Sequence, residues 1–475
     1  MTIKNINITK SIEQAQRLLD SDAKMSAEVR AVLNLMIVVV TLLIEKLGLN
    51  SSNSSKPPSL DPNRKKKMKK GKGRKPGGQK GRKGINLEQV NDPDVVETIE
   101  IDRRSIPAGD YKEAGFEKRQ VFDIVISSIV TEYQAQILVD STGRRFVACF
   151  PEGVTRPTQY GSGIKAHAVY MSMFQLIPYD RIRDYFADQC NTPVSAGSLV
   201  NFNQEAYDLL EEFEKIVRDN LIAASHAHAD ETGINIEGKR RWLHCVSNLE
   251  WTLYYPHLKR GGEAIKEIGV LEHFRGTLCH DHWKPYFQLN CLHALCNAHH
   301  LRELELAWET DKYKWAKNMQ SLLCEINEAA TDAGGLLSMT AQKRFLRRYR
   351  GLLTRGDREC PAPDEDTRKR GRAKRSKSRN LLERLRNFEE ETLRFMGDRD
   401  VAFSNNLGEN DIRMTKVQQK ISGCFRSMDG AKTFCRVRSY LSTCRKKGML
   451  PTEALNLLFL GKLPEFITQP AKGGE

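Results

Sequence analysis

Apolar and polar positions divide the chain into segments with different expected structures. Residues 1–49 follow a helical period and include the run VLNLMIVVVTLLI at residues 32–44. A membrane-crossing helix needs roughly 18–20 apolar residues, so this run is too short to span a bilayer. We therefore predict a helical segment over residues 1–49, either buried or self-associating as in a coiled coil, with attachment to a membrane surface as the alternative.

Residues 91–222 combine two kinds of pattern. Short alternating apolar runs over residues 91–160 predict a small β-rich module. Over residues 161–222, two amphipathic segments flank the turn NTPV. That arrangement predicts either a helix-turn-helix that reads DNA or a plain helical hairpin.

From residue 223 the apolar pattern changes to strands. SHAHADETGINI, RRWLHCVSN and WTLYYPHL read as a three-stranded meander, followed by a helical segment and the strand GTLCHD. This order predicts a mixed α/β sheet flanked by helices over residues 223–305. Residues 306–400 are expected to form a helical insertion, residues 401–462 the end of the core with C-terminal helices, and residues 463–475 a tail.

The charge balance changes the picture, because the formal net charge is +15 and the pI is near 9.2. Such an excess of cations favours a polyanionic partner such as DNA, although an anionic membrane surface would explain the sign equally well. Twelve Lys or Arg residues fall within residues 64–83, inside a Ser-, Pro- and Gly-rich arm at residues 50–90. Eight more lie within residues 368–379. We predict that both runs hold DNA phosphates, whereas a solvated linker is the plainer alternative.

The cations of the arm that we expect to bind DNA are Lys65, Lys66, Lys67, Lys69, Lys70, Arg74, Lys75, Lys80 and Arg82. The chain also has 11 cysteines without a regular framework and no secretory signal at its start. Reduced thiols in a cytoplasm are the expectation.

The stretch HAHADETGI contains the first candidate chemistry. Strand alternation places His226, His228 and Asp230 on one face and Glu231 on the other. Two histidines and a carboxylate can form a zinc site, Asp230 can belong to an acid pair, or the strand can be a core strand with polar trimmings. The local sequence does not choose among these three.

Two further acids are candidate partners of Asp230. Asp281 ends the strand GTLCHD, and Glu409 lies in SNNLGENDIRMTKVQQK, where SNN is expected to cap a helix. Carboxylates on neighbouring strands suit Mg²⁺, and two such ions support phosphoryl transfer. Arg413, Lys416 and Lys420 follow Glu409 at helical spacing and are expected to contact DNA. A surface ion pair between Glu409 and Arg413 is the alternative.

Four separated motifs, HAHADET, CHDHWKPY, CNAHHLRELE and NNLGENDIRMTKVQQKISGCFRS, occur in this order. Together with the upstream KPGGQKGRKG and the final SYLSTCRKKGMLPTEAL, they resemble transposases of the insertion-sequence 66 family in the Asp-Asp-Glu superfamily. The resemblance covers about residues 50–460. It implies a ribonuclease-H-like fold for the catalytic core.

The resemblance also implies an activity. Asp230, Asp281 and Glu409 would be the catalytic acids, coordinating two Mg²⁺ or Mn²⁺ ions that support cleavage of element ends and transfer of the 3′-hydroxyl to target DNA. It further implies a homo-oligomer on the DNA, accessory proteins of the same element, and a place at the bacterial nucleoid in the cytoplasm, without a membrane. A transposase-derived DNA-binding protein that lacks catalysis is the alternative function. A zinc hydrolase using His226 and His228 is a third.

Two departures from the family pattern stand out. Residues 95–155 contain Cys149 as their only cysteine, so the four-ligand zinc site found at this place in many members cannot form here. Asn410 follows the third acid where many members have Arg. If Glu409 were not the third acid, Glu303 or Glu305 would be next.

Several motifs remain after this assignment. Cys296 and His299 form a C-x-x-H pair that supplies two of the four ligands of a structural zinc site; we interpret it mainly as support for the sheet. Trp283 and Tyr286 are expected in the core, with contact to a DNA end as the alternative that they share with Lys284. Further cations that we predict to follow DNA phosphates, with ordinary surface charge as the alternative, are Arg426, Lys432, Arg436 and Arg438.

Overall fold

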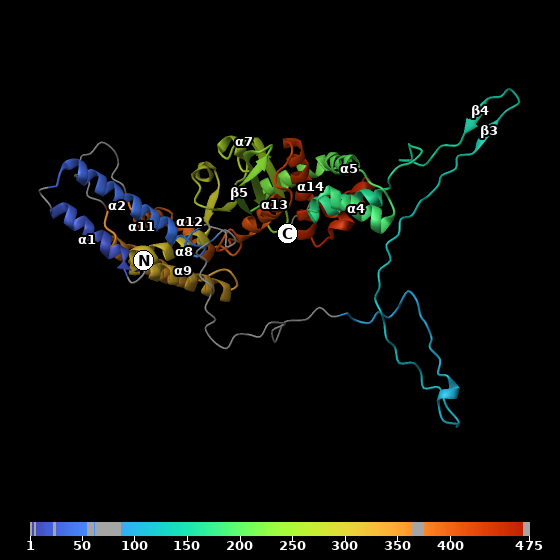
Figure 1. Ribbon diagram of the computed structural model, residues 1–475, viewed down its shortest axis with the longest axis horizontal. Helices are drawn as coiled ribbons and strands as arrows, with labels where there is room; N and C mark the ends of the chain where they lie inside the picture. The colour runs from blue at the N-terminus through green and yellow to red at the C-terminus, as the bar shows by residue number, and fades with distance from the viewer. Residues whose placement is uncertain are drawn as a thin grey trace.

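The computed structural model describes residues 2–3, 6–21, 25–54, 61, 87–362 and 375–468. Its centre is a five-stranded mixed sheet with strand order β7-β6-β5-β8-β9 (Figure 1). The strands are β5 (His226–Ile236), β6 (Lys239–Ser247), β7 (Thr252–His257), β8 (Thr277–His280) and β9 (Leu292–Leu295). The predicted mixed α/β fold is confirmed, and it is consistent with a ribonuclease-H-like core.

The pairing of β5 places the first two candidate acids. β5, β6 and β7 form the expected antiparallel meander, whose first turn has Glu237 and Gly238 at positive φ. This is the two-residue turn that matches strand twist. On its other side β5 runs parallel to β8, and that pairing ends at His228 opposite Cys279. Beyond this point the two strands separate, and Asp230 and Asp281 follow directly.

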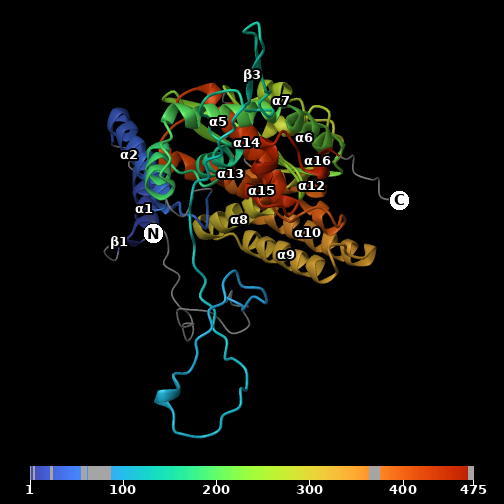
Figure 2. The ribbon, with the colours of Figure 1, turned by 90° about the vertical axis from the view of Figure 1, so that its right-hand side faces the viewer.

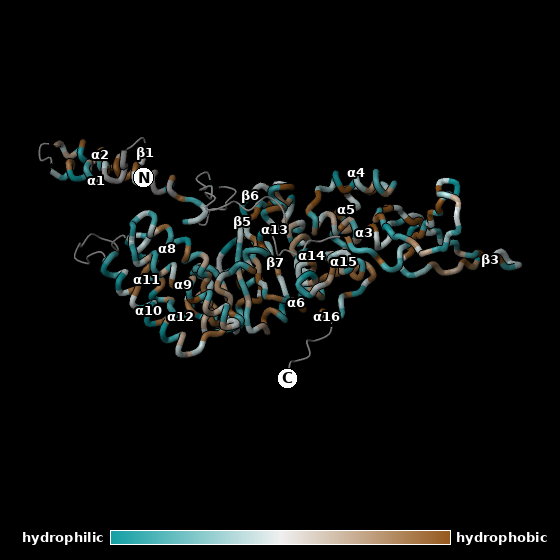
Figure 3. Tube along the Cα trace, turned by 90° about the horizontal axis from the view of Figure 1, so that it is seen from below, coloured by the Kyte–Doolittle hydropathy of each residue, from teal (hydrophilic) through white to brown (hydrophobic). Residues whose placement is uncertain are grey.

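Helices that precede and follow the sheet in the sequence cover one of its sides and share its main hydrophobic core (Figure 3). They are α3 (Ser162–Val169), η3 (Tyr170–Phe174), α4 (Tyr179–Cys190), α5 (Ala196–Leu209), α6 (Glu211–Ala223), α14 (Met428–Lys446), α15 (Pro451–Phe459) and α16 (Glu465–Thr468). α14 lies along the edge strand β7, where Ser439 and Thr443 accept hydrogen bonds from the backbone of Tyr254 and Thr252 at 2.8 and 3.1 Å. These bonds occupy edge amides that would otherwise pair with another chain.

The segment that predicted a helix-turn-helix or a helical hairpin contains α4 and α5. Asn191 ends α4 in the left-handed conformation, and Ser195 caps α5 through its hydroxyl. Leu199 and Phe202 on α5 are buried in the main core. One face of α5 therefore holds the domain together, and its opposite face remains exposed.

The residues between the sheet and the last candidate acid form a second, helical core, as predicted (Figure 2). Its elements are α8 (Asn297–Asp311), α9 (Lys314–Asp332), α10 (Met339–Glu359), α11 (Lys377–Asn387), α12 (Glu389–Leu393) and η5 (Arg394–Met396). The core surrounds the fully buried Trp315 and includes Cys279 and Ala294 from the sheet. The insertion is thus packed directly against β8 and β9.

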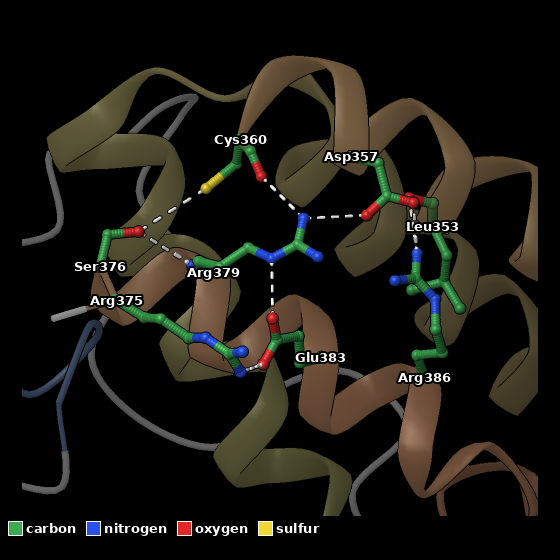
Figure 4. A network of polar contacts seen from close by, with 8 residues as sticks. All are labelled: Leu353, Asp357, Cys360, Arg375, Ser376, Arg379, Glu383 and Arg386. Atoms are coloured by element: carbon green, nitrogen blue, oxygen red, sulfur yellow. Dashed lines mark hydrogen bonds and ion pairs between the residues drawn. The ribbon is translucent and has the colours of Figure 1, made fainter. Parts of the chain in front are cut away.

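The second basic run is only partly described, because residues 368–374 lie outside the described ranges. Figure 4 shows that two of its cations are held by acids of the insertion. Arg379 pairs with Asp357 at 2.9 Å and with Glu383 at 3.0 Å, and Arg375 also pairs with Glu383. For Arg375 and Arg379 the prediction of phosphate contacts is therefore corrected: Arg379 joins α10 to α11, and Arg375 pairs with Glu383 of α11.

The N-terminal segment is helical, as predicted. It contains the short strands β1 (Thr2–Ile3) and β2 (Ile6–Asn7), then α1 (Ile8–Ser21) and α2 (Ala27–Gly48). Ten large apolar side chains of α2 are exposed by 42% or more: Val29, Val32, Leu35, Met36, Val38, Val39, Val40, Leu42, Leu43 and Leu47. Leu33 and Ile37 are partly buried. The structure thus does not bury most of the apolar surface of α2, and self-association stays a prediction. No helix in the described parts of the chain is long and apolar enough to cross a bilayer.

Residues 91–160 differ from the predicted β-rich module. All of them are described, and they form an extended segment with one hairpin, β3 (Ile137–Val139) with β4 (Arg145–Val147), and the short turn η2 (Arg103–Ser105) (Figure 1). Val121 and Ile129 are 92% and 90% exposed. Alternation makes a strand amphipathic, but without a second layer there is nothing for the apolar face to pack on. The predicted cations of the arm, from Lys65 to Arg82, lie outside the described residues.

Two glycines of α10 provide a matched test of the insertion core. A Cβ on Gly356 would lie 2.6 Å from Leu382 Cδ1 and 3.2 Å from Trp315 Cδ2, whereas Gly351 has nothing within 4 Å. We expect Gly356→Ala to lower the free energy of unfolding by about 1–3 kcal/mol through overpacking. Gly351→Ala should raise it by up to about 1 kcal/mol, because Ala favours helix. Denaturant titration of both variants checks this; equal effects would contradict the packing described.

Candidate active site

The first two acids stand where β5 and β8 separate. Asp230 lies on β5, two residues beyond its last pairing with β8, and its Oδ1 accepts a hydrogen bond from the Glu231 amide at 2.9 Å. Asp281 directly follows β8, and its Oδ1 accepts from the Trp283 amide at 3.0 Å. Ligands of α/β sheets bind outside the carboxyl ends of parallel strands, which is the position that Asp281 occupies.

The third acid comes from α13 (Asn406–Ser422), which packs along β5 (Figure 1). Glu409 lies in its first turn, and its Oε1 is 4.0 Å from both Cys296 Sγ and His299 Nδ1. The predicted alternative, a surface pair of Glu409 with Arg413, is therefore not what the structure shows. Lys416, one turn beyond Arg413, donates to the Gly233 carbonyl of β5 and helps to hold the helix against the strand.

Charge repulsion couples the three acids. The pKa of Asp230 is raised to about 7, first by burial and then by the neighbouring charges of Glu231, Asp281 and Glu409. Burial also raises the pKa of Asp281. Like charges crowded in a poorly hydrated place disfavour ionisation unless a cation offsets them. The site therefore has the electrostatic character of a cation-binding centre.

The spacing of these acids bears on how many ions they would hold. Among the described residues, the three acids are not a set whose ligand atoms all lie within 4.8 Å of one another. A cage for a single ion is therefore not preformed. In a two-ion centre the ions lie about 3.5–4 Å apart, so their carboxylates spread over a wider space.

A fourth acid, Glu231, occupies the opposite face of β5, as strand alternation requires. Its side chain is 1% exposed; Arg260 Nε donates to Oε1 at 2.9 Å and the Tyr286 hydroxyl to Oε2 at 2.6 Å. Burial raises the pKa of Glu231, and the charge of Asp281 raises it further. Glu231 therefore ties the segment after β8 to β5.

Arg260 is a site residue that the sequence did not reveal. Its guanidinium lies over two indole rings, with its carbon 5.0 Å from the Trp242 centroid and 4.7 Å from that of Trp283. Burial raises the pKa of Asp281, and the positive charge of Arg260 lowers it. No spacing or motif links residue 260 to Asp281, so only the folded chain shows that their charges interact.

A cavity of about 280 Å³ opens beside Asp281, between the sheet and the insertion. It is lined by Asp281, His282, Trp283, Leu295, Cys296, His299, His300, Glu303 and Arg384. Arg384 comes from α11 and pairs with Glu303. Glu303, the reserve third acid, is therefore already held by a cation, and Glu305 pairs with Lys317 at 3.2 Å.

The C-x-x-H pair adjoins the third acid. The ligand atoms of Cys296, His299 and Glu409 all lie within 4.8 Å of one another. The two other nearby histidines do not complete a zinc site, because His300 contacts Asn297 at 3.0 Å and His293 contacts His280 at 3.1 Å. Burial raises the pKa of the Cys296 thiol and lowers that of His299 to about 4, so both are neutral near pH 7.

The two histidines of HAHADETGI have separate partners. His226 Nε2 contacts Asp398 at 3.1 Å, whereas His228 Nδ1 contacts Asn405 Oδ1 at 2.8 Å. Within the described chain, His226, His228 and Asp230 do not bring three ligand atoms together. His226 instead groups with Asp398 and Asp400. The arrangement does not support the alternative of a zinc hydrolase built on this strand.

The remaining predicted residues separate into exposed and structural groups. Arg413, Lys416 and Lys420 are exposed on α13, and Lys284, Arg426 and Lys432 are exposed elsewhere. Tyr286 is buried in the core as expected, and the partly buried Trp283 contacts both Tyr286 and Arg260.

Two cations thought able to follow phosphates are structural. Arg436 pairs with Glu214 and lies 3.6 Å from the Tyr207 ring centroid. Arg438 is 5% exposed and donates to the carbonyl of Phe174 at 3.0 Å. For these two the prediction of phosphate contacts is wrong, because their guanidinium groups contact partners on α5, α6 and η3. Those partners are distant in sequence, so the local pattern did not indicate them.

Comparison with known proteins agrees with this fold and site. Residues 157–433 match the model of the Transposase IS66 family, whose catalytic domain is of the Asp-Asp-Glu class. That match covers more than half of the 475 residues, so the chain belongs to the Transposase IS66 family. Residues 12–88 match a family of unknown function (DUF6444). No curated protein matches the chain.

The raised pKa of Asp230 predicts a pH-dependent effect on stability without metal. With a folded-state pKa near 7, against an ordinary value near 4, stability falls as pH rises from about 4 to about 7. Asp230→Asn removes the buried charge, so it should stabilise the metal-free protein at pH 8 by up to about 4 kcal/mol. At pH 4 the two proteins should differ little.

Thermal melts in EDTA at pH 4 and pH 8 measure this difference. Asp332→Asn, at an exposed acid at the end of α9, is the control and should show no such pH dependence. The same shift for Asp230→Asn at both pH values would contradict the electrostatic crowding described.

Proposed function

We propose that this chain is a catalytically active DNA transposase that cleaves the ends of its mobile element and joins the freed 3′-hydroxyl to target DNA by two-metal-ion phosphoryl transfer. Membership of the Transposase IS66 family supports DNA transposition as the process. The single observation that carries catalysis is the convergence of Asp230, Asp281 and Glu409: burial raises the pKa of Asp230, and the charges of Glu231, Asp281 and Glu409 raise it further.

Asp230, Asp281 and Glu409 would hold the two Mg²⁺ or Mn²⁺ ions. Carboxylate oxygens suit both metals, and the crowded negative charge fits divalent cations. When bound, such ions activate the attacking oxygen and stabilise the leaving one. Asp230 and Asp281 are presented by the rigid sheet, whereas Glu409 is presented by α13.

The surroundings of the acids leave their charge available. Cys296 and His299 are neutral neighbours of Glu409, so neither offsets its carboxylate near pH 7. Arg260 is engaged by Glu231 on the far face of β5 and acts on Asp281 only at longer range. The negative charge at the centre is therefore left for metal and, through metal, for the DNA backbone.

The DNA itself would lie along exposed cations. Arg413 and Lys420 follow Glu409 on the exposed side of α13. Lys416 is exposed too, although its amine also contacts β5. Cations beside the catalytic acids position a phosphate backbone without reading its sequence.

Assembly into a homo-oligomer on the DNA would use the apolar α2, where side chains such as Leu35, Met36 and Leu42 are more than half exposed. Accessory proteins of the same element and a nucleoid location belong to the same proposal.

Substitution of the acids tests catalysis. We expect Asp230→Asn, Asp281→Asn and Glu409→Gln each to reduce cleavage of a labelled duplex carrying an element end by roughly a thousandfold or more. Removing a metal ligand forfeits several kcal/mol of transition-state stabilisation. Binding of the same duplex, measured by fluorescence anisotropy in Ca²⁺, should persist.

Asp332→Asn is the matched control and should cut like the wild type. A wild type that binds element ends but neither nicks nor joins them in Mg²⁺ would establish the alternative, a transposase-derived DNA-binding protein. Retained cleavage by Glu409→Gln would move the third acid elsewhere, with Glu303 the nearest candidate in the cavity.

A further inference from the structure

One buried amide connects the elements that carry the candidate acids. Asn405, directly before α13, is 2% exposed. Its Nδ2 donates to the Ala229 carbonyl at 2.8 Å, and its Oδ1 contacts His228 Nδ1 at 2.8 Å. Both partners lie on β5, immediately before Asp230. The side chain therefore continues the hydrogen bonding of β5 where its pairing with β8 has ended.

The backbone of Asn405 reaches the other two parts of the site. Its amide donates to Cys296 Sγ at 3.1 Å, and its carbonyl accepts from the Glu409 amide at 3.0 Å. The Cys296 amide in turn donates to the His280 carbonyl at 2.9 Å, next to Asp281. Asn405 is thus bonded to the residue before Asp230 and to Glu409, and it is linked to Asp281 through Cys296 and His280.

The hydrogen bonds of the Asn405 side chain differ from the capping bond that the sequence predicted. SNN was expected to cap α13, yet Asn405 makes no side-chain capping bond to the helix. Its amide faces a carbonyl on one side and an imidazole on the other, which fixes its orientation: nitrogen toward Ala229 and oxygen toward a protonated Nδ1 of His228. A helix end that forgoes its side-chain cap gives up about 1 kcal/mol. The bonds to β5 offset that loss.

Gly408 makes room for this side chain. A Cβ at Gly408 would lie 3.1 Å from Asn405 Oδ1 and 3.3 Å from Nδ2. Those separations are tight enough that the amide must move by a few tenths of an ångström. Gly408 has an ordinary helical backbone, so the only demand that favours glycine here is the space for Asn405.

We propose that Asn405 is a positioning residue, which sets the placement of Glu409 relative to Asp230 and is itself kept in register by Gly408 and His228. The inference rests on the proposed function, since it concerns the same metal-binding acids. Asn405 touches neither metal nor DNA in this account. It acts by joining α13 to β5 at the point where their carboxylates must share ions.

A purely structural role for Asn405 makes a different prediction for Gly408→Ala. Alanine favours the helix by roughly 1 kcal/mol over glycine, whereas its Cβ crowds the Asn405 amide, so a purely structural role allows a change of stability in either direction but leaves metal binding intact. A positioning role predicts weaker metal binding even where the melting temperature does not fall. Disturbing residues that orient metal ligands typically weakens metal affinity by about 10–100-fold.

The experiment measures Mn²⁺ binding by electron paramagnetic resonance, together with melting temperature, in the full-length protein. Binding to the acid site is defined as the Mn²⁺ that the Asp230→Asn variant fails to bind, which excludes the separate group at His226, Asp398 and Asp400. We expect Gly408→Ala to weaken this binding by about tenfold. Gly351→Ala, a helical glycine with open space, should bind like the wild type.

His228 provides a second pair of variants should Gly408→Ala lower the melting temperature. His228→Ala removes the donor to Asn405 Oδ1 and should also weaken Asp230-dependent Mn²⁺ binding by about tenfold. His228→Asn places an amide nitrogen near the lost Nδ1 and should restore most of it. Wild-type affinity in both Gly408→Ala and His228→Ala overturns the proposal, as does equal weakening by His228→Ala and His228→Asn.

The outcomes separate this inference from the proposed function. A wild type that binds Mn²⁺ through Asp230 but does not cut DNA would refute catalysis, while the Gly408 comparison would still decide the role of Asn405. A wild type without Asp230-dependent Mn²⁺ binding would overturn the positioning role as well, since there would be no metal site to position.

Discussion

The site depends on placing buried carboxylates close enough to repel one another. Asp230, Asp281 and Glu409 come from a central strand, the end of its parallel neighbour and a helix more than a hundred residues later. Burial, followed by the charges of Glu231, Asp281 and Glu409, raises the pKa of Asp230 to about 7, so the folded chain holds these acids against an electrostatic cost. Two hydrophobic cores, one on each side of the sheet, provide the rigidity that this requires. A divalent cation would relieve the repulsion, so the proposed metal binding and the proposed catalysis would both depend on this electrostatic cost.

Much of this organisation could be predicted because it follows from local pattern. The alternation around Asp230 and the end of the strand at Asp281 predicted neighbouring strands, and the sheet confirms the mixed fold. Helical periodicity likewise predicted the insertion. The β-rich module over residues 91–160 differs from its prediction because alternation describes one amphipathic face and says nothing of a partner layer. The apolar pattern of α2 likewise does not say what covers its exposed side chains, and a second copy of the chain is one candidate.

Contacts between distant residues could not be predicted. The fold brings together Arg260 with Glu231 and Arg379 with Asp357, and no spacing in the sequence predicts either pair. Asn405 is the most instructive case, because its position before a helix predicted a cap, whereas its side chain turns to β5. A local preference was overridden by a buried carbonyl that needed a donor. The charge runs indicated which class of partner to expect, but they did not indicate the role of each cation. Arg438, for example, is a buried cation that stabilises the core.

The most direct test of the central claim is a crystal structure with an element-end duplex and Mn²⁺, using anomalous scattering to locate the metal. The account predicts two peaks about 3.5–4 Å apart, held by Asp230, Asp281 and Glu409. Both peaks should disappear in the Asp230→Asn variant. Manganese bound only at Cys296, His299 and Glu409, or only at His226, Asp398 and Asp400, would contradict it.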